Sequence, residues 1–363
     1  MSAQYLSAGS GGIARCARLS VRALAPQLRV RPLSVEDHDP IDAGGVAART
    51  FAGNRPAFVA ANALGAFDSG WTLYDFAGTA RAHGPLALLG RPYALWVHGW
   101  EIWPGNLRPD YARVVRGAKA VFANSRHTER RLAESLPGLS SVQCCPLGTE
   151  YDAPPQASAP ARREPMALFV GRNDEMFAKG QDILIALWPQ VVARLPDARL
   201  CFVGGGERLD RLRALAAASP AASSIEVLGQ IDDDEVARLF RRGRLFAMLS
   251  EVEGFGLVFA EAMSHGVPIL TSRQDASQEI NHEGATGFSV DRDDHEAIAD
   301  RIAAVLRDDG LFARLSARAF DTWAETYCFS AFRARFLAAA AAAGLSQRTL
   351  AAAPGDATDF ERA

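Results

Sequence analysis

Lysine is nearly absent from this chain of 363 residues, in which only Lys119 and Lys179 occur among 39 basic side chains. Cysteine is also sparse, with five residues and no C-x-x-C pair. An odd number without that spacing argues against a zinc site and a disulfide scaffold, and it fits a reducing compartment. No run approaches the ~18 apolar residues of a spanning helix, and the N-terminus has glycines and arginines where a signal peptide has an apolar core. We therefore expect a cytoplasmic protein.

Apolar residues make up 48% of the chain, which is enough for a large core, and the length favours two domains. The formal net charge of −3 is not that of a dedicated nucleic-acid binder. The charge is unevenly distributed: residues 1–150 carry 16 basic and 11 acidic side chains, whereas residues 151–363 carry 23 and 31. Either the first half faces something anionic, such as a membrane surface or a phosphorylated acceptor, or a basic and an acidic face dock on each other.

Apolar runs of strand length alternate with stretches of helical period, which is the pattern of parallel β/α units. In the first half this predicts strands at residues 28–35, 58–62, 93–98, 120–124 and 142–146, and helices at residues 13–24 and 128–136. Residues 153–165, rich in proline, alanine and serine, are predicted to be a linker. The pattern then restarts, with strands at residues 166–170, 199–203, 225–228, 245–249 and 268–271, and helices at residues 181–195, 209–218, 233–242 and 259–265.

This repeated alternation predicts an α/β protein with two Rossmann-like β/α/β domains that face each other across a cleft. The carboxyl ends of both sheets would meet at the cleft and bind a ligand there. The predicted parts are an N-terminal domain (1–152), a linker (153–165), a C-terminal domain (166–328), and a C-terminal helix that packs back on the first domain, with a tail (329–363).

Two cations follow the first strand of the second domain, in the segment VGRNDEMFAKG. Arg172 and Lys179 would project from this loop into the cleft and suit a diphosphate, because Arg binds bidentately and Lys acts as a point charge. A solvated loop with incidental cations is the alternative, and the scarcity of lysine elsewhere favours a ligand. The next strand ends in a glycine turn at Gly204, which lets the backbone approach a ligand but lacks the G-x-G-x-x-G register of a nicotinamide enzyme.

Two glutamates, Glu253 and Glu261, stand eight residues apart in the segment EGFGLVFAEAMSHGVPIL. A carboxylate among apolar residues is costly unless its oxygens accept hydrogen bonds, and sugar hydroxyls are good donors for that purpose. One glutamate would hold a ribose and the other a transferred hexose. The amides of residues 254–258, at a helix N-terminus, would meet phosphate oxygens. The alternative is a helix N-terminal turn whose acidic residues only complement the helix dipole. That alternative explains one glutamate, but it does not explain two glutamates together with the glycines.

In the first domain, the segment SGGIARCARL again leads a glycine loop into a helix, so its amides would close on the diphosphate from the opposite side. His98 ends a predicted strand in the segment WVHGWEIW, beside three tryptophans suited to stacking on sugar. A lone histidine is more often structural than catalytic, but this position faces the predicted cleft. The segment ANSRHTERRL is interpreted as a structural strand–turn–helix capped by Ser125, with His127 outside the site.

The order of these segments resembles the family 4 retaining glycosyltransferases of the GT-B fold, over roughly residues 8–330. GGIAR, VHGWE, ANSRHTERRL, PLGTE, VGRNDEMFAKG, VGGGERL, LGQIDD and EGFGLVFAEAMSHGVP carry the resemblance, and Glu253 and Glu261 match that family's E-x7-E motif. The chain departs from the family at Leu147, where an asparagine is common. The spacing from Arg172 to Lys179 is one residue longer than in some members, and the first strand, at about residues 4–7, is short.

The resemblance assigns roles residue by residue. It implies that the first domain binds the acceptor and the second the nucleotide sugar, with Glu253 at the donor sugar, Glu261 at the ribose and His98 at the reacting sugar. The expected catalytic residues are His98, Arg172, Lys179 and Glu253. The expected donor-binding residues are Gly12, Gly171, Arg172, Lys179, Gly204, Ile231, Asp233, Glu253, Phe255, Gly256, Leu257, Val258 and Glu261.

The activity implied by the resemblance is metal-independent transfer of a hexose, mannose or glucose, with retention, in polysaccharide biosynthesis. The donor would be of the GDP-mannose or UDP-glucose type, with no cofactor or metal, and the acceptor a glycan or a lipid-linked glycan at the inner face of a membrane. LGQIDD is similar to the corresponding segment of bacterial phosphatidylinositol mannosyltransferases, which hints at a guanine nucleotide. No carboxylate nucleophile is evident, so front-face attack is the simplest mechanism. The alternatives are a non-catalytic nucleotide- or glycan-binding homologue, a GT-B sugar epimerase and a phosphorylase.

Overall fold

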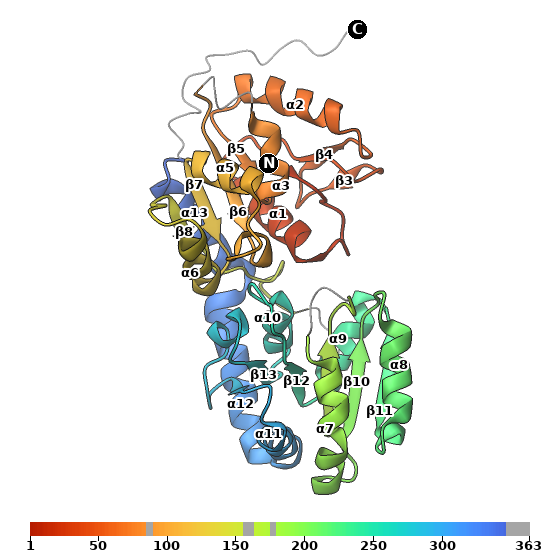
Figure 1. Cartoon of the computed structure of the whole chain (residues 1–363). Helices are drawn as coiled ribbons and strands as arrows, with labels where there is room; N and C mark the ends of the chain where they lie inside the picture. The colour runs from red at the N-terminus through yellow and green to blue at the C-terminus, as the bar shows by residue number, and fades with distance from the viewer. Residues whose placement is uncertain (85–89, 155–162, 175–178, 346–363) are drawn as a thin grey trace.

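The computed structural model describes residues 1–84, 90–154, 163–174 and 179–345, which form two α/β lobes (Figure 1). The first lobe has a sheet with strand order β3-β4-β2-β1-β5-β6-β7-β8, and the second has one with order β11-β10-β9-β12-β13-β14. Among the described residues, every strand pair is parallel except the antiparallel pair β3–β4. The α/β fold class predicted from the alternation is confirmed.

The strands of the first lobe are mostly short. They are β1 (Ser2–Ala3), β2 (Leu33–Ser34), β3 (Ile41–Asp42), β4 (Ala47–Thr50), β5 (Thr72–Tyr74), β6 (Tyr93–Val97), β7 (Ala120–Ala123) and β8 (Val142–Cys144). Those of the second lobe are β9 (Met166–Val170), β10 (Arg199–Val203), β11 (Ile225–Gly229), β12 (Leu245–Met248), β13 (Ile269–Ser272) and β14 (Gly287–Val290).

Helices cover both sheets. In the first lobe they are α1 (Gly11–Leu24), α2 (Arg55–Asp68), α3 (Ala77–Ala80), α5 (Pro109–Gly117) and α6 (Arg126–Ser135), with short 3-10 helices η1 (Arg81–His83) and η2 (Trp100–Ile102). In the second they are α7 (Gln181–Arg194), α8 (Leu209–Ala218), η3 (Ala222–Ser224), α9 (Asp233–Arg242), α10 (Leu257–Ser264), η4 (Ala276–Glu279), α11 (His295–Arg307) and α12 (Asp309–Thr322). A π-helix, η5 (Trp323–Tyr327), leads into α13 (Phe329–Ala342).

The strand expected at residues 58–62 is wrong, because this segment lies inside helix α2. Asn54 caps that helix by accepting a hydrogen bond from the Ala57 amide at 3.1 Å, and Pro56 suits its first turn. Phe58 and Asn62 are buried one turn apart on the same face. The short apolar run therefore winds around a helix, with Phe58 and Asn62 on its buried face and Val59 and Ala60 exposed.

Other differences concern strands too short to show a period. The strand expected at residues 28–35 is reduced to β2, and the first strand lies at Ser2–Ala3 rather than at residues 4–7. Strands β3, β4, β5 and β14 were not predicted, since runs of two to four residues carry almost no alternation. The remaining predicted strands and helices agree with the structure to within a few residues at their ends.

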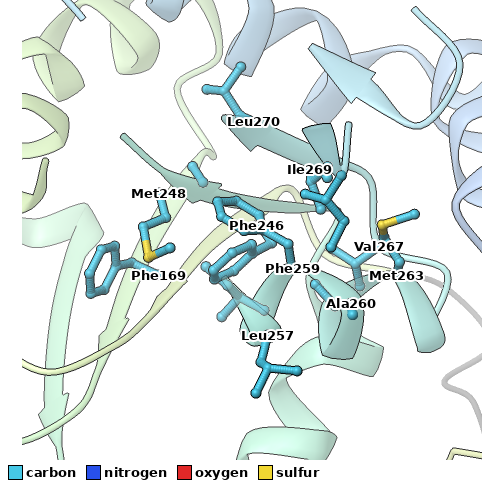
Figure 2. Close-up of a cluster of buried hydrophobic side chains, with 14 of the residues drawn as sticks. Phe169, Phe246, Met248, Leu257, Phe259, Ala260, Met263, Val267, Ile269 and Leu270 are labelled. Atoms are coloured by element: carbon cyan, nitrogen blue, oxygen red, sulfur yellow. The ribbon is translucent and has the colours of Figure 1, made fainter. Parts of the chain in front are cut away.

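The second lobe is held together by a dense apolar core beneath α10. Phe246 and Phe259 pack edge to face with ring centroids 5.1 Å apart, and Figure 2 shows them among side chains from β12, α10 and β13. Strand β12 is buried along its whole length, because helices cover both faces of the parallel sheet. This core holds the first turn of α10 at the carboxyl ends of the strands.

The chain crosses between the lobes twice, and the two crossings lie side by side. The Thr149 amide donates to the Tyr327 carbonyl at 2.7 Å, and the Phe329 amide donates to the Tyr151 carbonyl at 3.1 Å. Beyond the second crossing, α13 returns to the first lobe, where Phe336 lies 5.4 Å from the Trp96 ring. Of the predicted linker, residues 155–162 lie outside the described residues.

Candidate functional site

Three loops converge where strands β9, β10 and β12 end. The loop after β10 approaches the loop after β9 so closely that a Cβ on Gly204 would lie 2.0 Å from the Gly171 carbonyl oxygen. With a φ of +130° as well, only glycine fits at position 204. A Cβ on Gly171 would in turn lie 3.5 Å from the Lys179 side chain. The predicted donor-binding residues Gly171, Gly204 and Lys179 are therefore neighbours.

Lys179 and Glu253 form an ion pair at this edge of the sheet. The Lys179 ammonium lies 3.2 Å from the Glu253 carboxylate, and both side chains are about one-fifth exposed (22% and 19%). The Ala276 amide holds the Glu253 backbone by donating to its carbonyl at 3.1 Å. Lys179, expected to bind a phosphate, thus contacts Glu253, expected to bind a sugar. Their separation in the sequence did not indicate this contact.

Arg172 is placed differently. Its side chain is 73% exposed, and its guanidinium pairs with Asp174 at 2.9 Å. The structure therefore keeps Arg172 in the same loop region as Lys179 but gives it an acidic partner at the surface. Residues 175–178, between the two cations, lie outside the described residues.

A buried carboxyl group that was not among the predicted site residues supports Glu253 from behind. Asp275 is fully buried and accepts hydrogen bonds from the Ser250 hydroxyl at 2.6 Å and the Ser277 amide at 2.9 Å. Burial raises the pKa of Asp275 to about 6. By holding η4 in place, Asp275 holds the Ala276 amide that binds Glu253.

His98 lies in the first lobe, immediately after β6. Its amide donates to the Glu101 carboxylate at 2.7 Å, and its Nε2 lies 2.7 Å from the Asp75 carbonyl oxygen. Burial lowers the pKa of His98, so the ring is neutral near pH 7. Because a carbonyl only accepts, Nε2 carries the proton and Nδ1 is left as an acceptor.

The two lobes meet backbone to backbone beside His98. A Cβ on Gly254 would lie 1.7 Å from the His98 carbonyl oxygen, and one on Gly99 would lie 3.2 Å from the Gly254 Cα. Asn124 donates to the same His98 carbonyl at 2.9 Å, and the Thr128 hydroxyl donates to the Gly254 carbonyl at 3.3 Å. The turn that follows Glu253 is therefore in direct contact with the turn that follows His98.

The segment ANSRHTERRL does more than the structural role expected of it. Ser125 caps α6 as predicted, accepting from the Thr128 amide at 3.0 Å, and His127 packs against Trp103 outside the cleft. Asn124 and Thr128, however, reach the contact between the lobes. A polar residue at the end of each parallel strand was the available signal, and Asn124 follows β7 as His98 follows β6.

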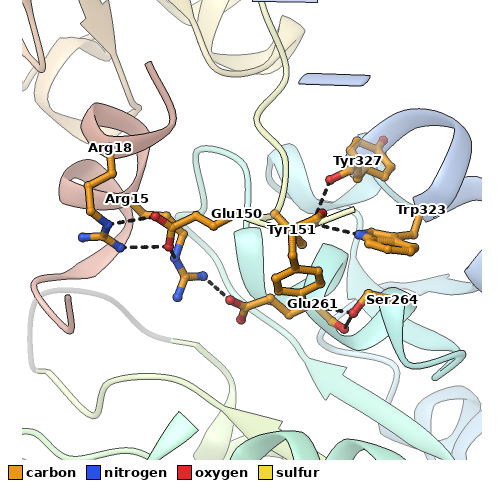
Figure 3. Close-up of polar contacts among 9 residues, drawn as sticks. Arg15, Arg18, Glu150, Tyr151, Glu261, Ser264, Trp323 and Tyr327 are labelled. Atoms are coloured by element: carbon orange, nitrogen blue, oxygen red, sulfur yellow. Dashed lines mark hydrogen bonds and ion pairs between the residues drawn. The ribbon is translucent and has the colours of Figure 1, made fainter. Parts of the chain in front are cut away.

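Glu261 lies on α10 and is bound by an arginine of the first lobe (Figure 3). Arg15, on α1, donates to one oxygen of the Glu261 carboxylate. The α1 N-terminus faces α10, since a Cβ on Gly12 would lie 4.0 Å from the Leu257 side chain. Arg15 was not among the predicted site residues, although it lies one turn beyond Gly12 on the same helix.

The remaining predicted residues surround these groups. Ile231 and Asp233 follow β11, and the Asp233 charge acts on Glu261 by raising its pKa. Phe255 is 6% exposed and packs against Tyr327, so its backbone and not its ring is available to a ligand. Leu257 and Val258 form the first turn of α10, whose amides have no partner inside the helix.

Two further properties of the described residues bear on the site. They contain no group of three or more histidine, cysteine, aspartate or glutamate side chains that could hold a metal ion. None of their helices is long and apolar enough to cross a membrane.

Comparison with known proteins identifies the family. Residues 152–322 match the family described as "Glycosyl transferases group 1". The chain is 30% identical over 273 residues to the GDP-mannose-dependent alpha-(1-6)-phosphatidylinositol monomannoside mannosyltransferase of Mycolicibacterium smegmatis, covering 67% of this chain and 71% of that protein. It is 34% identical over 226 residues to the phosphatidyl-myo-inositol mannosyltransferase of the same organism, covering 61% and 56%. The chain belongs to the group 1 glycosyltransferases.

Solved structures with a similar fold show the architecture of this glycosyltransferase. HepE of Anabaena, in complex with UDP and glucose, superposes with a TM-score of 0.76 at 18% identity over 94% of this chain and 99% of its own. Sucrose-phosphate synthase of Thermosynechococcus elongatus gives a TM-score of 0.76 at 19% identity over 90% and 92%. The two facing lobes are therefore those of the GT-B fold.

The contact between the lobes makes a prediction about Gly254. In Gly254→Ala the new Cβ would overlap the His98 carbonyl oxygen, so one turn must move. We expect the free energy of unfolding to fall by about 1–3 kcal/mol, as for overpacking in a core. Gly65→Ala is the matched control, because nothing lies within 4 Å of a Cβ there and alanine suits a helix interior. Equal denaturation midpoints for Gly254→Ala and wild type would contradict the close contact.

Proposed function

We propose that this glycosyltransferase moves a hexose, mannose or glucose, from a nucleoside diphosphate sugar to a glycan or lipid-linked acceptor with retention of configuration and without a metal ion. The observation that carries the proposal is the ion pair between Lys179 and Glu253 at the carboxyl ends of β9 and β12, opposite His98. A donor with an anionic diphosphate and a hydroxyl-rich sugar offers a partner to each charge. Binding would exchange one ion pair for two contacts with the donor.

The donor class follows from these groups and from the relatives. Lys179 and the first-turn amides of α10 would bind the diphosphate, Glu253 the hexose and Glu261 the ribose. The mannosyltransferase of Mycolicibacterium smegmatis is GDP-mannose-dependent, whereas HepE was solved with UDP and glucose. The sequence relationship favours GDP-mannose.

The mechanism depends on the charges that develop as the donor sugar is transferred. Cleavage of the anomeric bond leaves negative charge on the diphosphate, which Lys179 and the backbone amides stabilise without a metal. Two carboxyl groups of the first lobe lie near His98, and both are engaged: Glu101 by the His98 amide and Asp75 by the Gln4 amide and the Thr79 hydroxyl. These hydrogen bonds support a mechanism without a carboxylate nucleophile, in which the departing phosphate would take the acceptor proton on the same face.

His98 has a supporting role in this mechanism. Its Nε2–H is held by the Asp75 carbonyl, which leaves Nδ1 to accept a hydrogen bond from a sugar hydroxyl. A neutral imidazole that accepts a hydrogen bond from one sugar hydroxyl orients the sugar. It does not need to remove the proton as a base.

Substitution of Lys179 tests the assignment. Lys179→Ala should lower turnover of GDP-mannose or UDP-glucose about a hundredfold, since a charge-assisted contact that strengthens in the transition state is worth ~3 kcal/mol or more. Lys119→Ala, which removes the chain's other lysine at an exposed position, should turn over like wild type. Wild-type turnover in Lys179→Ala would remove the phosphate role, and tight donor binding with no turnover in the wild type would indicate a non-catalytic homologue.

Metal independence is tested by chelation. If Lys179 and backbone amides supply the positive potential, EDTA should leave the initial rate of sugar transfer unchanged, and adding Mg²⁺ or Mn²⁺ should not raise it. A rate that EDTA abolishes and a divalent ion restores would show that the metal carries the diphosphate charge.

We further propose that the protein acts in the cytoplasm and binds peripherally to the membrane that carries its acceptor. Of the α2 side chains that the structure describes, the exposed ones are Arg55 at the start of the helix and five apolar residues, Pro56, Val59, Ala60, Leu64 and Phe67. Leu64 is 72% exposed and Phe67 55%. Arg55 and Arg91 flank these apolar residues, the latter 5.3 Å from the Phe67 ring. Apolar side chains beside arginines, on a lobe with excess basic charge, suit an anionic lipid surface.

Vesicle sedimentation tests the α2 surface. The double variant Leu64→Gln, Phe67→Gln should bind vesicles of phosphatidylglycerol and phosphatidylcholine several-fold more weakly than wild type, because it loses most of the exposed apolar area. Leu215→Gln, on the second lobe and 39% exposed, should bind like wild type. No binding by the wild type would refute the peripheral contact and leave the transferase proposal untouched.

A further inference from the structure

A chain of alternating charges crosses the boundary between the lobes (Figure 3). Arg15 donates to the Glu261 carboxylate and lies 3.5 Å from the carboxylate of Glu150. Arg18 makes two hydrogen bonds to Glu150, at 2.8 and 3.0 Å. The network thus runs from α1, through the residue that precedes the first crossing, to α10.

Helices α1 and α10 place this network beside the proposed nucleotide site. Gly12 and Arg15 lie one turn apart on α1, and Leu257 and Glu261 lie one turn apart on α10. Gly12 faces Leu257, while Arg15 reaches Glu261. The side chains of Arg15 and Glu261 are only 28% and 22% exposed, so this ion pair is partly withdrawn from water.

The contact uses one carboxylate oxygen only. Arg15 donates to Oε1, and among the described residues no donor binds Oε2. An ionised carboxylate with one oxygen held and the other open can accept hydrogen bonds from vicinal hydroxyls of a ribose. A guanidinium that bound both oxygens would exclude such a ligand.

We propose that Arg15 is the positioning residue for Glu261: reaching across from the opposite lobe, it orients the carboxylate and keeps it ionised for the ribose of the nucleotide. This inference rests on the ribose role of Glu261 in the proposed function. Arg15 itself does not contact the nucleotide.

Electrostatics around Glu261 supports the proposal. Burial raises the pKa of Glu261, and the charges of Asp233 and Glu150 raise it further, whereas Arg15 opposes them by charge and hydrogen bond. The pKa of Arg15 is raised in turn, chiefly by Glu261, so Arg15 remains a cation. Tyr151 lies close to Arg15 and Glu261, and its hydroxyl is hydrogen-bonded to the Ser264 hydroxyl at 3.0 Å. Burial raises the pKa of Tyr151. Arg15 is therefore the charge that favours ionised Glu261.

The pH dependence of nucleotide binding distinguishes this role from a merely structural one. Glu261 binds the ribose well as a carboxylate and poorly as an acid, so affinity falls as the pH drops through its pKa. Without Arg15 that pKa is higher, and the loss of affinity must begin at a higher pH. A residue that only stabilised the fold would lower the melting temperature without moving this titration.

The experiment is calorimetric titration of the full chain with GDP and with UDP between about pH 5 and 8. For Arg15→Ala we expect the nucleotide affinity to be about tenfold weaker at neutral pH. The fall in affinity on acidification should begin about one pH unit higher than in the wild type. Arg15→Lys should restore much of both. Glu261→Gln should show no Glu261 limb, leaving the titration of the nucleotide's own phosphate as the reference.

The matched control is Arg130→Ala, which removes another arginine–glutamate contact between the lobes, the pair with Glu279 at 3.2 Å. It should leave the affinity and its pH profile unchanged. If Glu261→Ala binds both nucleotides as wild type does, or if wild type binds neither, the ribose assignment is wrong. If Glu261→Ala weakens binding but Arg15→Ala keeps the wild-type affinity and pH profile, Arg15 is not the positioning residue.

Discussion

The close approach of Gly254 to the His98 carbonyl is the constraint on which the site depends. No side chain larger than hydrogen fits there, so the two lobes touch through backbone atoms at one point of the cleft. Glu253 immediately precedes that point on one side, and His98 immediately precedes Gly99 on the other. The contact therefore places the turn that carries Glu253 directly beside the turn that carries His98.

Charge pairing offsets the cost of burying the carboxylates of the site. A partly buried carboxylate is costly alone, and each of the two glutamates of the E-x7-E motif has a cationic partner. Lys179 comes from the same lobe as Glu253, whereas Arg15 comes from the opposite lobe to Glu261. A bound donor would therefore replace the contact of Lys179 with Glu253 inside the second lobe. It would add a ligand to the Arg15–Glu261 pair, which links the two lobes.

The uneven charge of the two halves has a partial structural explanation. In the ion pairs Arg15–Glu261 and Arg130–Glu279, the first half supplies the arginine and the second half the glutamate. This is the docking of a basic on an acidic face, one of the two explanations that composition left open. Arg55 and Arg91, beside the exposed apolar residues of α2, make no ion pair with the second lobe among the described residues: Arg55 pairs with Glu36 of its own lobe and Arg91 stacks on Phe67. A membrane surface remains the proposed partner of this region.

The sequence alone determined the α/β class, most of the longer elements and the stretches that build the cleft, because apolar period and glycine-flanked charges are local signals. It did not determine which charges meet. The contacts of Lys179 with Glu253 and of Arg15 with Glu261 span 74 and 246 residues, and no local pattern encodes them. Residues 58–62 of α2 were mistaken for a strand because the exposed side of this helix is apolar too, which hides the helical period, although Asn54 and Pro56 just before them are local signals of a helix start. Tertiary structure decided these points, since the energy of a buried charge depends on what the fold brings next to it.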